Sequence, residues 1–178
     1  MKIIFLDFDG VILTLRTCIA HDQHGWSNAA PDPVLVNVLK RCCAQGVCIV
    51  VSSTWRTHQE TCHAKLEEAG LLNFLHADWR TIENHFGGAV DSRPYEIAEW
   101  LSRHPEVKDY RILDDDSWNW TQEQAPHSLK CCPEDGASAR VMKDLLEWAG
   151  AKKKPSERKP LIVAPDEGET ARYGKVRG

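Results

Sequence analysis

The chain alternates between short apolar runs and longer segments whose apolar residues recur at helical spacing. The runs typical of strands buried in a parallel sheet lie at residues 2–8, 47–51, 109–113 and 127–132. Helices are expected at residues 33–45, 57–69, 94–103 and 137–149. Because strands and helices take turns along the chain, the pattern predicts an α/β fold, a three-layer Rossmann-like domain with a central parallel sheet.

Small residues mark the expected helix ends, and the composition changes after the last of them. Ser92 is a candidate N-cap, and the glycines that follow predicted helices are Gly46, Gly70 and Gly150. Residues 1–150 are therefore interpreted as one folded domain, and residues 151–178 as a C-terminal tail, mobile or packed only in part. The basic run at 152–159 offers contacts to phosphate, but a solvated tail is its more common role.

Composition and charge narrow the class of protein. The 178 residues are 42% hydrophobic and 27% charged, with a net charge of -4, so any binding of nucleic acid must be local rather than driven by an overall basic field. No apolar run approaches the roughly 20 residues of a membrane span, and Asp7 and Asp9 interrupt the only candidate for a signal peptide. Seven cysteines, an odd number with two adjacent pairs, favour a cytoplasmic protein without disulfides.

Three polar clusters each follow a predicted strand directly. Their sequences are DFDG at residues 7–10, SSTWR at 52–56 and DDDS at 114–117. The carboxyl ends of parallel strands share one edge of a sheet, and ligand sites form there, near the point where the strand order reverses. The three clusters are therefore expected to meet in space, although each one alone has an ordinary explanation as a turn, a helix cap or a solvated loop.

The carboxylates in these clusters predict a metal site. Asp7 and Asp9 are two residues apart, so in extended chain they face the same side, and Asp114 and Asp115 add two more acids at a neighbouring strand end. Four clustered carboxylates repel one another, and a hard divalent cation relieves that repulsion. Oxygen-only ligands favour Mg²⁺ over zinc, and bound Mg²⁺ commonly takes a substrate phosphate oxygen as a further ligand.

Other side chains leave two explanations open. A weak zinc signal comes from three residues that could share a helix face, namely His58, Cys62 and His63. The favoured interpretation is that they are ordinary helix residues. Stacking on a nucleobase competes with packing in the core for Trp55, Trp118 and Trp120. On the excursion between residues 14 and 32, the side chains that could line the mouth of a site are His21, His24 and Trp26.

The motifs FLDFDGVI, VVSSTWR and RILDDDS resemble the haloacid-dehalogenase-like (HAD) superfamily of phosphohydrolases. The further pattern SRPYEIAEWL is similar to a small branch of that superfamily found in RNA-repair and phage-related proteins. The resemblance implies that Asp7 is the nucleophile, which forms an aspartyl-phosphate, and that Asp9 is the general acid and then the general base. It also implies that Asp7, the backbone carbonyl of Asp9 and Asp115 bind Mg²⁺, with Asp114 beside them.

The same resemblance implies a hydroxyl and a cation that hold the phosphoryl group. Ser52 matches the hydroxyl residue, and Ser53 remains open because the end of the strand is uncertain by one residue. The cation, which offsets charge on the transferring group, is matched to Arg93 at the start of a helix, with Arg56 as its rival.

Spacing and family together suggest a substrate class. Neither segment between the motifs is long enough for a large cap domain, so the site is expected to be open and to admit a bulky substrate, although a small flap fits the spacing. We expect a Mg²⁺-dependent phosphatase whose favoured substrate is a nucleotide or a nucleic-acid terminal phosphate. The alternatives are a small-metabolite or protein phosphatase and a non-catalytic binding module on the HAD fold.

Overall fold

The computed structural model describes residues 1–21, 28–82 and 92–151. Within them, five strands form one sheet in the order β3-β2-β1-β4-β5, and every neighbouring pair is parallel. The strands are β1 (Lys2–Leu6), β2 (Val47–Val51), β3 (Leu75–Arg80), β4 (Asp109–Asp114) and β5 (Ser128–Lys130). The order reverses at β1, so β1 lies at the centre of the sheet and its carboxyl end is where a ligand site is expected.

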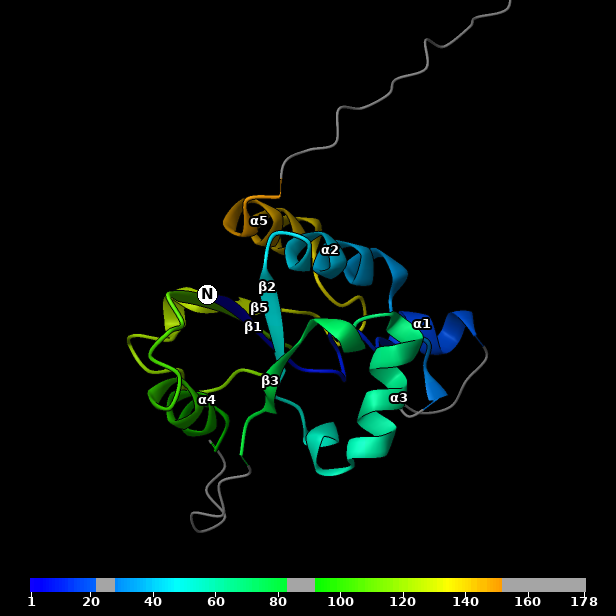
Figure 1. The fold of residues 1–178 in the computed structure, drawn as a ribbon. Helices are drawn as coiled ribbons and strands as arrows, with labels where there is room; N and C mark the ends of the chain where they lie inside the picture. Colours follow the sequence, from blue (N-terminus) through cyan, green and yellow to red (C-terminus); the bar gives the residue numbers. More distant parts are fainter. Residues whose placement is uncertain (22–27, 83–91, 152–178) are drawn as a thin grey trace, which may run out of the picture.

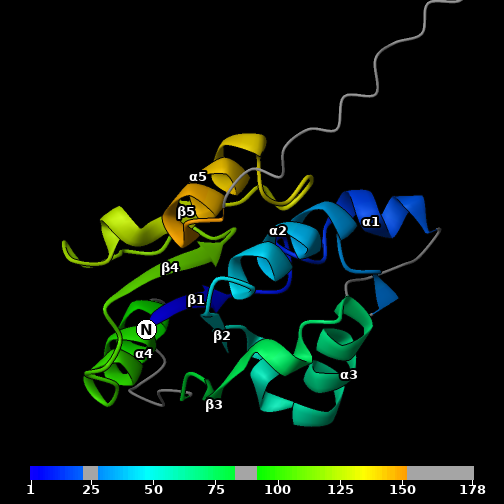
Figure 2. The ribbon, with the colours of Figure 1, turned by 45° about the horizontal axis from the view of Figure 1, so that its top comes forward.

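Helices cover both faces of this sheet (Figure 1). They are α1 (Leu15–Ala20), α2 (Pro33–Cys43), α3 (Gln59–Ala69), α4 (Ser92–Ser102) and α5 (Ala139–Ala149). In the turned view, α5, α2 and α3 follow one another across one face, whereas α4 lies on the other (Figure 2). The predicted three-layer α/β architecture is confirmed.

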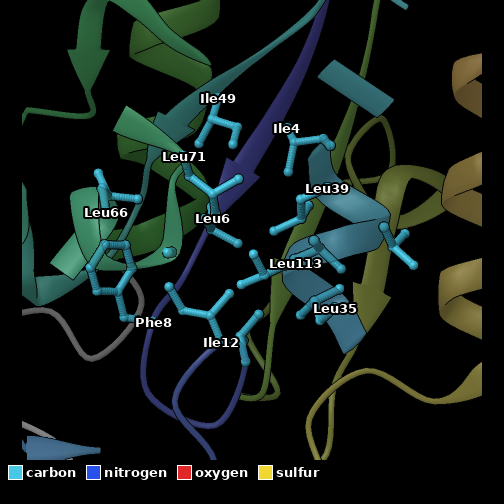
Figure 3. Packing of buried hydrophobic residues seen from close by; sticks show 14 of the residues in the cluster. Ile4, Leu6, Phe8, Ile12, Leu35, Leu39, Ile49, Leu66, Leu71 and Leu113 are labelled. Atoms are coloured by element: carbon cyan, nitrogen blue, oxygen red, sulfur yellow. The ribbon is translucent and has the colours of Figure 1, made fainter. Parts of the chain in front are cut away.

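Side chains of β1 alternate between the two faces and so divide the core in two. Ile4 and Leu6 belong to the larger cluster, with apolar residues of α2, α3 and α5 (Figure 3). Ile3 and Phe5 belong to the smaller cluster, where they pack against Trp100 of α4. All four β1 side chains are fully buried, which holds β1, and therefore the first acidic motif, at a fixed depth in the molecule.

Two elements were not expected from the sequence. β3 lies at the edge of the sheet, its residues LHADWR are mixed in polarity, and its pairing with β2 shifts register between Ile49 and Val51, so it lacks the alternation that identifies a strand. The second is the short helix α1, which begins with a capping box between Thr14 and Thr17. Helix α1 is the only element formed in the described part of the excursion between β1 and α2, and no large cap is present among the described residues.

Some predicted element ends move by a few residues. β1 stops at Leu6, so the first acidic motif begins just beyond the strand. The helix predicted at 33–45 ends at Cys43 and has Ala44, not Gly46, as its C-cap. Ser92 is the first residue of α4 rather than its N-cap, which contradicts the prediction. His24, Trp26 and the tail after Ala151 lie outside the described residues.

Candidate active site

The polar residues at the carboxyl edge stand in one row across the sheet. Leu6 of β1 is in register with Val51 of β2 and with Leu113 of β4, so the next residue of each strand continues that register. On the other side of β2, Thr81 donates its N–H to the carbonyl of Val51 at 3.0 Å. Thr81 is therefore the register partner of Ser52, the residue that follows Val51. Partners in parallel strands lie about 4.8 Å apart and share a face. The resulting row is Thr81, Ser52, Asp7 and Asp114.

Three carboxylates of the predicted metal site converge at this row. One oxygen each from Asp7, Asp114 and Asp115 lies within 4.8 Å of the others. Burial, with repulsion from Asp7, raises the pKa of Asp115 to about 6, and burial raises the pKa of Asp114 to about 7 despite the neighbouring Arg93. Buried, mutually repelling oxygen ligands of this kind fit a hard divalent cation such as Mg²⁺.

Gly10 makes room for one of these carboxylates. Its backbone φ is +67°, in the left-handed region that favours glycine, and a Cβ at this position would overlap the carboxylate of Asp115. The DxDG motif and the acidic motif after β4 are thus packed directly against each other. A side chain at position 10 would displace Asp115 and strain the turn at the same time.

Asp114 is held by three donors, and one of them is a cation. Its Oδ2 accepts from Arg93 Nη1 at 2.8 Å, and its Oδ1 accepts from Trp118 Nε1 at 3.0 Å and from the N–H of Asp116 at 2.9 Å. The same Arg93 Nη1 lies 3.2 Å from Asp7 Oδ2, and the guanidinium also lies over the Trp118 ring. Asp114 therefore belongs to the acidic cluster and also holds Arg93 next to Asp7.

The carboxylate of Asp9 accepts hydrogen bonds from an indole. Trp55 Nε1 lies 3.1 Å from Asp9 Oδ1 and 3.0 Å from Oδ2, and the Trp55 ring packs against Phe8. Partial burial raises the pKa of Asp9; the bond from Trp55 lowers it and repulsion from Asp7 raises it further. A carboxyl group with a raised pKa retains its proton more readily near neutral pH, as a general acid must.

The two serines after β2 have different environments. Ser53 Oγ accepts the N–H of Trp55 at 3.4 Å and caps the 3₁₀ turn Thr54–Thr57. Ser52 is 1% exposed, and its Oγ has no hydrogen-bond partner among the described residues. Leaving a buried hydroxyl unpaired costs about 1–3 kcal/mol, so Ser52 is the serine whose hydroxyl is available to a ligand.

Thr81 is a candidate site residue that the sequence analysis missed. It follows β3, is 1% exposed, and its Oγ1 also lacks a hydrogen-bond partner in the described part of the chain. Two unpaired buried hydroxyls therefore stand side by side in the carboxyl-edge row, because Thr81 and Ser52 are register partners. Only recognition of β3 as a strand would have placed Thr81 at this edge.

The two candidate cations also differ. Arg56 is buried, pairs with Glu96 at 2.8 Å, and donates to the carbonyl of Ser53 at 2.6 Å. These contacts tie the SSTWR segment to helix α4. Arg93, in contrast, contacts the carboxylate of Asp7.

The remaining candidates are dispersed. His58 contacts the Thr57 hydroxyl, and His63 packs edge-on against Trp79, so His58, Cys62 and His63 form no ligand cluster among the described residues. Trp120 packs against the smaller core cluster, and His21 is exposed at the end of α1.

Fold and site together define a class. A parallel sheet reversed at β1, with DxDG after β1, a hydroxyl after β2 and paired acids after β4, is the arrangement of a HAD-type domain. A family model described as the HAD domain in Swiss Army Knife RNA repair proteins matches residues 3–141. The chain belongs to this family. Neither the curated proteins nor the solved structures contain a significant match. No helix in the described ranges is long and apolar enough to cross a membrane.

Proposed function

We propose that this chain is a Mg²⁺-dependent phosphatase that works through an aspartyl-phosphate on Asp7. The observation that carries the proposal is the convergence of three groups on one carboxylate. Asp7 lies in the same row as Ser52. A carboxylate oxygen of Asp115 lies within 4.8 Å of an Asp7 oxygen, and Arg93 Nη1 lies 3.2 Å from Asp7 Oδ2. A nucleophile, a cation-binding acid and a guanidinium are the parts that phosphoryl transfer requires.

The metal ligands proposed are the carboxylates of Asp7 and Asp115 and the backbone carbonyl of Asp9, with Asp114 adjoining. Bound Mg²⁺ supplies positive charge next to the phosphoryl oxygens. Asp114 contributes mainly through Arg93, because both its oxygens already accept hydrogen bonds from Arg93, Trp118 and the backbone.

In the first step, an oxygen of Asp7 attacks phosphorus and the bond from phosphorus to the leaving oxygen breaks. Asp9 gives its proton to that leaving oxygen. In the second step, Asp9 takes a proton from water as the water attacks phosphorus, and the bond between Asp7 and phosphorus breaks to release phosphate.

Ser52 and Arg93 would hold the transferring group from two sides of Asp7. The Ser52 hydroxyl is buried and unpartnered in the described residues, so it is free to donate to a phosphoryl oxygen. Arg93 already faces Asp7 and offers charge-assisted hydrogen bonds to the same group. Thr81 would extend the row of hydroxyls by one strand.

The favoured substrate class is a nucleotide or a nucleic-acid terminal phosphate. The description of the family as a domain of RNA repair proteins supports this class. The absence of a large cap among the described elements is compatible with a polymeric substrate. Seven cysteines, none of them in a disulfide, support a cytoplasmic setting.

The test is phosphate release from 5′- and 3′-phosphorylated oligonucleotides, free nucleotides, sugar phosphates and a phosphopeptide, with Mg²⁺ and with EDTA. Asp7→Asn is nearly isosteric and should abolish Mg²⁺-dependent release while the melting temperature is retained. Asp116→Ala is the matched control, since this exposed neighbour contributes its backbone N–H and should keep activity. Release that persists in Asp7→Asn contradicts the covalent mechanism. Preference for sugar phosphates or phosphopeptides replaces the substrate class, and no release from any substrate favours a binding module.

A further inference from the structure

A second cluster of potential metal ligands lies at the opposite edge of the sheet from Asp7. His76 is near the amino end of β3, and His104 and Glu106 lie between α4 and β4. One ligand atom from each of the three lies within 4.8 Å of the others. Because all strands are parallel, their amino ends lie at the other edge of the sheet from the acidic cluster.

Buried Trp100 fixes the orientation of both imidazoles. The His104 ring stacks on Trp100 with centroids 3.7 Å apart, and the His76 ring meets Trp100 edge-on at 5.1 Å. The two imidazole rings are themselves 5.1 Å apart and nearly perpendicular. The indole is anchored in turn, because Trp100 Nε1 donates to the carbonyl of Asp78 at 3.1 Å. Two imidazoles held by one buried ring have little freedom left to lose on binding an ion.

The Nδ1 atoms of both histidines face backbone groups, which leaves each Nε2 as the ligand atom. His104 Nδ1 is 2.7 Å from the carbonyl of Trp100, an arrangement in which Nδ1–H donates and Nε2 carries the lone pair. His76 Nδ1 accepts the N–H of Asp78 at 3.1 Å and also lies 3.3 Å from the carbonyl of Asp78. With Nδ1 accepting, the neutral His76 ring carries its proton on Nε2, so binding of a metal at Nε2 requires the ring to exchange the bond from the Asp78 N–H for one from Nδ1–H to the Asp78 carbonyl. Backbone carbonyls orient metal-bound histidines in this way.

Two carboxylates lie beside the two imidazoles. Glu106 is exposed and its carboxylate is the third member of the cluster. Asp78 Oδ2 lies 3.6 Å from His104 Nε2 and also accepts from Arg103 at 2.8 Å. A donor set of two imidazoles and one or two carboxylates matches four-coordinate zinc and similar divalent ions, and it is unlike the oxygen-only set that favours Mg²⁺.

We propose that His76, His104 and Glu106 form a structural site for a divalent transition metal of the zinc class, separate from the catalytic edge. The ion would tie the edge strand β3 to the connection between α4 and β4. Since it would bind the folded chain and not the unfolded one, it should raise the melting temperature in a concentration-dependent way.

The experiment is calorimetric titration of the reduced, metal-free full chain with Zn²⁺ in excess Mg²⁺, which competes for the acidic cluster. Wild type should bind one zinc ion, and Glu106→Gln should weaken that affinity at least about tenfold, as loss of metal-site residues commonly does. Glu106 is exposed, so the change is expected to leave the fold intact. His104→Gln should weaken binding in the same way, with circular dichroism as the check that the variant is folded.

His58→Ala is the matched control, because His58 is an exposed histidine outside the cluster and belongs to the zinc candidate suggested by sequence spacing. It should bind zinc as wild type does. The proposal is overturned if Glu106→Gln and folded His104→Gln retain wild-type affinity, if wild type binds no zinc, or if His58→Ala alone loses it. Titration with Co²⁺ gives a further test: a thiolate-to-cobalt charge-transfer band would assign the ion to cysteine and refute the site.

Discussion

Replacing Ser52 by alanine should move stability and activity in opposite directions. Its Oγ is buried and has no partner among the described residues, so its removal relieves an unpaired polar group worth about 1–3 kcal/mol. For a chain of this size, that gain corresponds to a rise in melting temperature of about 2–12 °C. If the hydroxyl donates to the charged phosphoryl group during turnover, its loss removes about 1.5–3 kcal/mol. That range lowers kcat/KM by roughly 10- to 150-fold.

Ser53→Ala separates the two serines. Ser53 Oγ caps the 3₁₀ turn through the N–H of Trp55, so its removal should lower the melting temperature instead of raising it. Thermal denaturation in EDTA and steady-state kinetics in Mg²⁺, on both variants, give the comparison. The reasoning is refuted if Ser52→Ala is destabilised or keeps full kcat/KM. If Ser53→Ala is the variant that gains stability and loses activity, the assignment of the two serines is reversed.

Three further predictions concern the same edge of the sheet. Thr81→Val should raise the melting temperature and lower kcat/KM, whereas Thr81→Ser should keep the wild-type rate; equal rates for valine and serine would remove Thr81 from the site. Trp55→Phe removes the N–H donor of Asp9 and should slow hydrolysis of alkyl phosphates more than that of p-nitrophenyl phosphate, whose leaving group needs little protonation; equal losses would contradict this role. The raised pKa values of Asp115, about 6, and Asp114, about 7, favour the protonated folded state. Their contribution to stability is therefore present below about pH 4 and is lost as the pH rises to about 7, and Mg²⁺ should restore it at pH 7. Melting curves in EDTA that show no loss of stability between about pH 4 and 7, or no effect of Mg²⁺ at pH 7, would count against a metal-binding acidic cluster.

The sequence alone determined the fold class and brought together the motifs of the candidate site. Apolar runs such as residues 47–51 identify buried strands without knowledge of their neighbours, because burial on both faces requires continuous apolar sequence. Parallel strands place their carboxyl ends at one edge of the sheet, so the sequence already predicts that the DxDG and DDDS motifs lie close together. The family match at residues 3–141 agrees with that prediction.

Only the tertiary structure distinguished between neighbouring residues of one type. Ser52 and Ser53 are equivalent in sequence, but the 3₁₀ turn engages one hydroxyl and leaves the other unpaired. Arg56 and Arg93 are both plausible cations, but Glu96 pairs with Arg56 while Arg93 faces Asp7. Such differences depend on which side chains approach from other elements, and local sequence does not encode those distances.

The same limit explains the sites that the sequence did not reveal. Edge strand β3 has mixed polarity and an irregular register, so neither Thr81 at its carboxyl end nor His76 at its amino end could be placed. Strand pairing fixed the first beside Ser52, and packing on Trp100 fixed the second beside His104. Sequence periodicity determines which elements form because it reflects burial, whereas the contacts between side chains far apart in the chain are decided only when those elements pack.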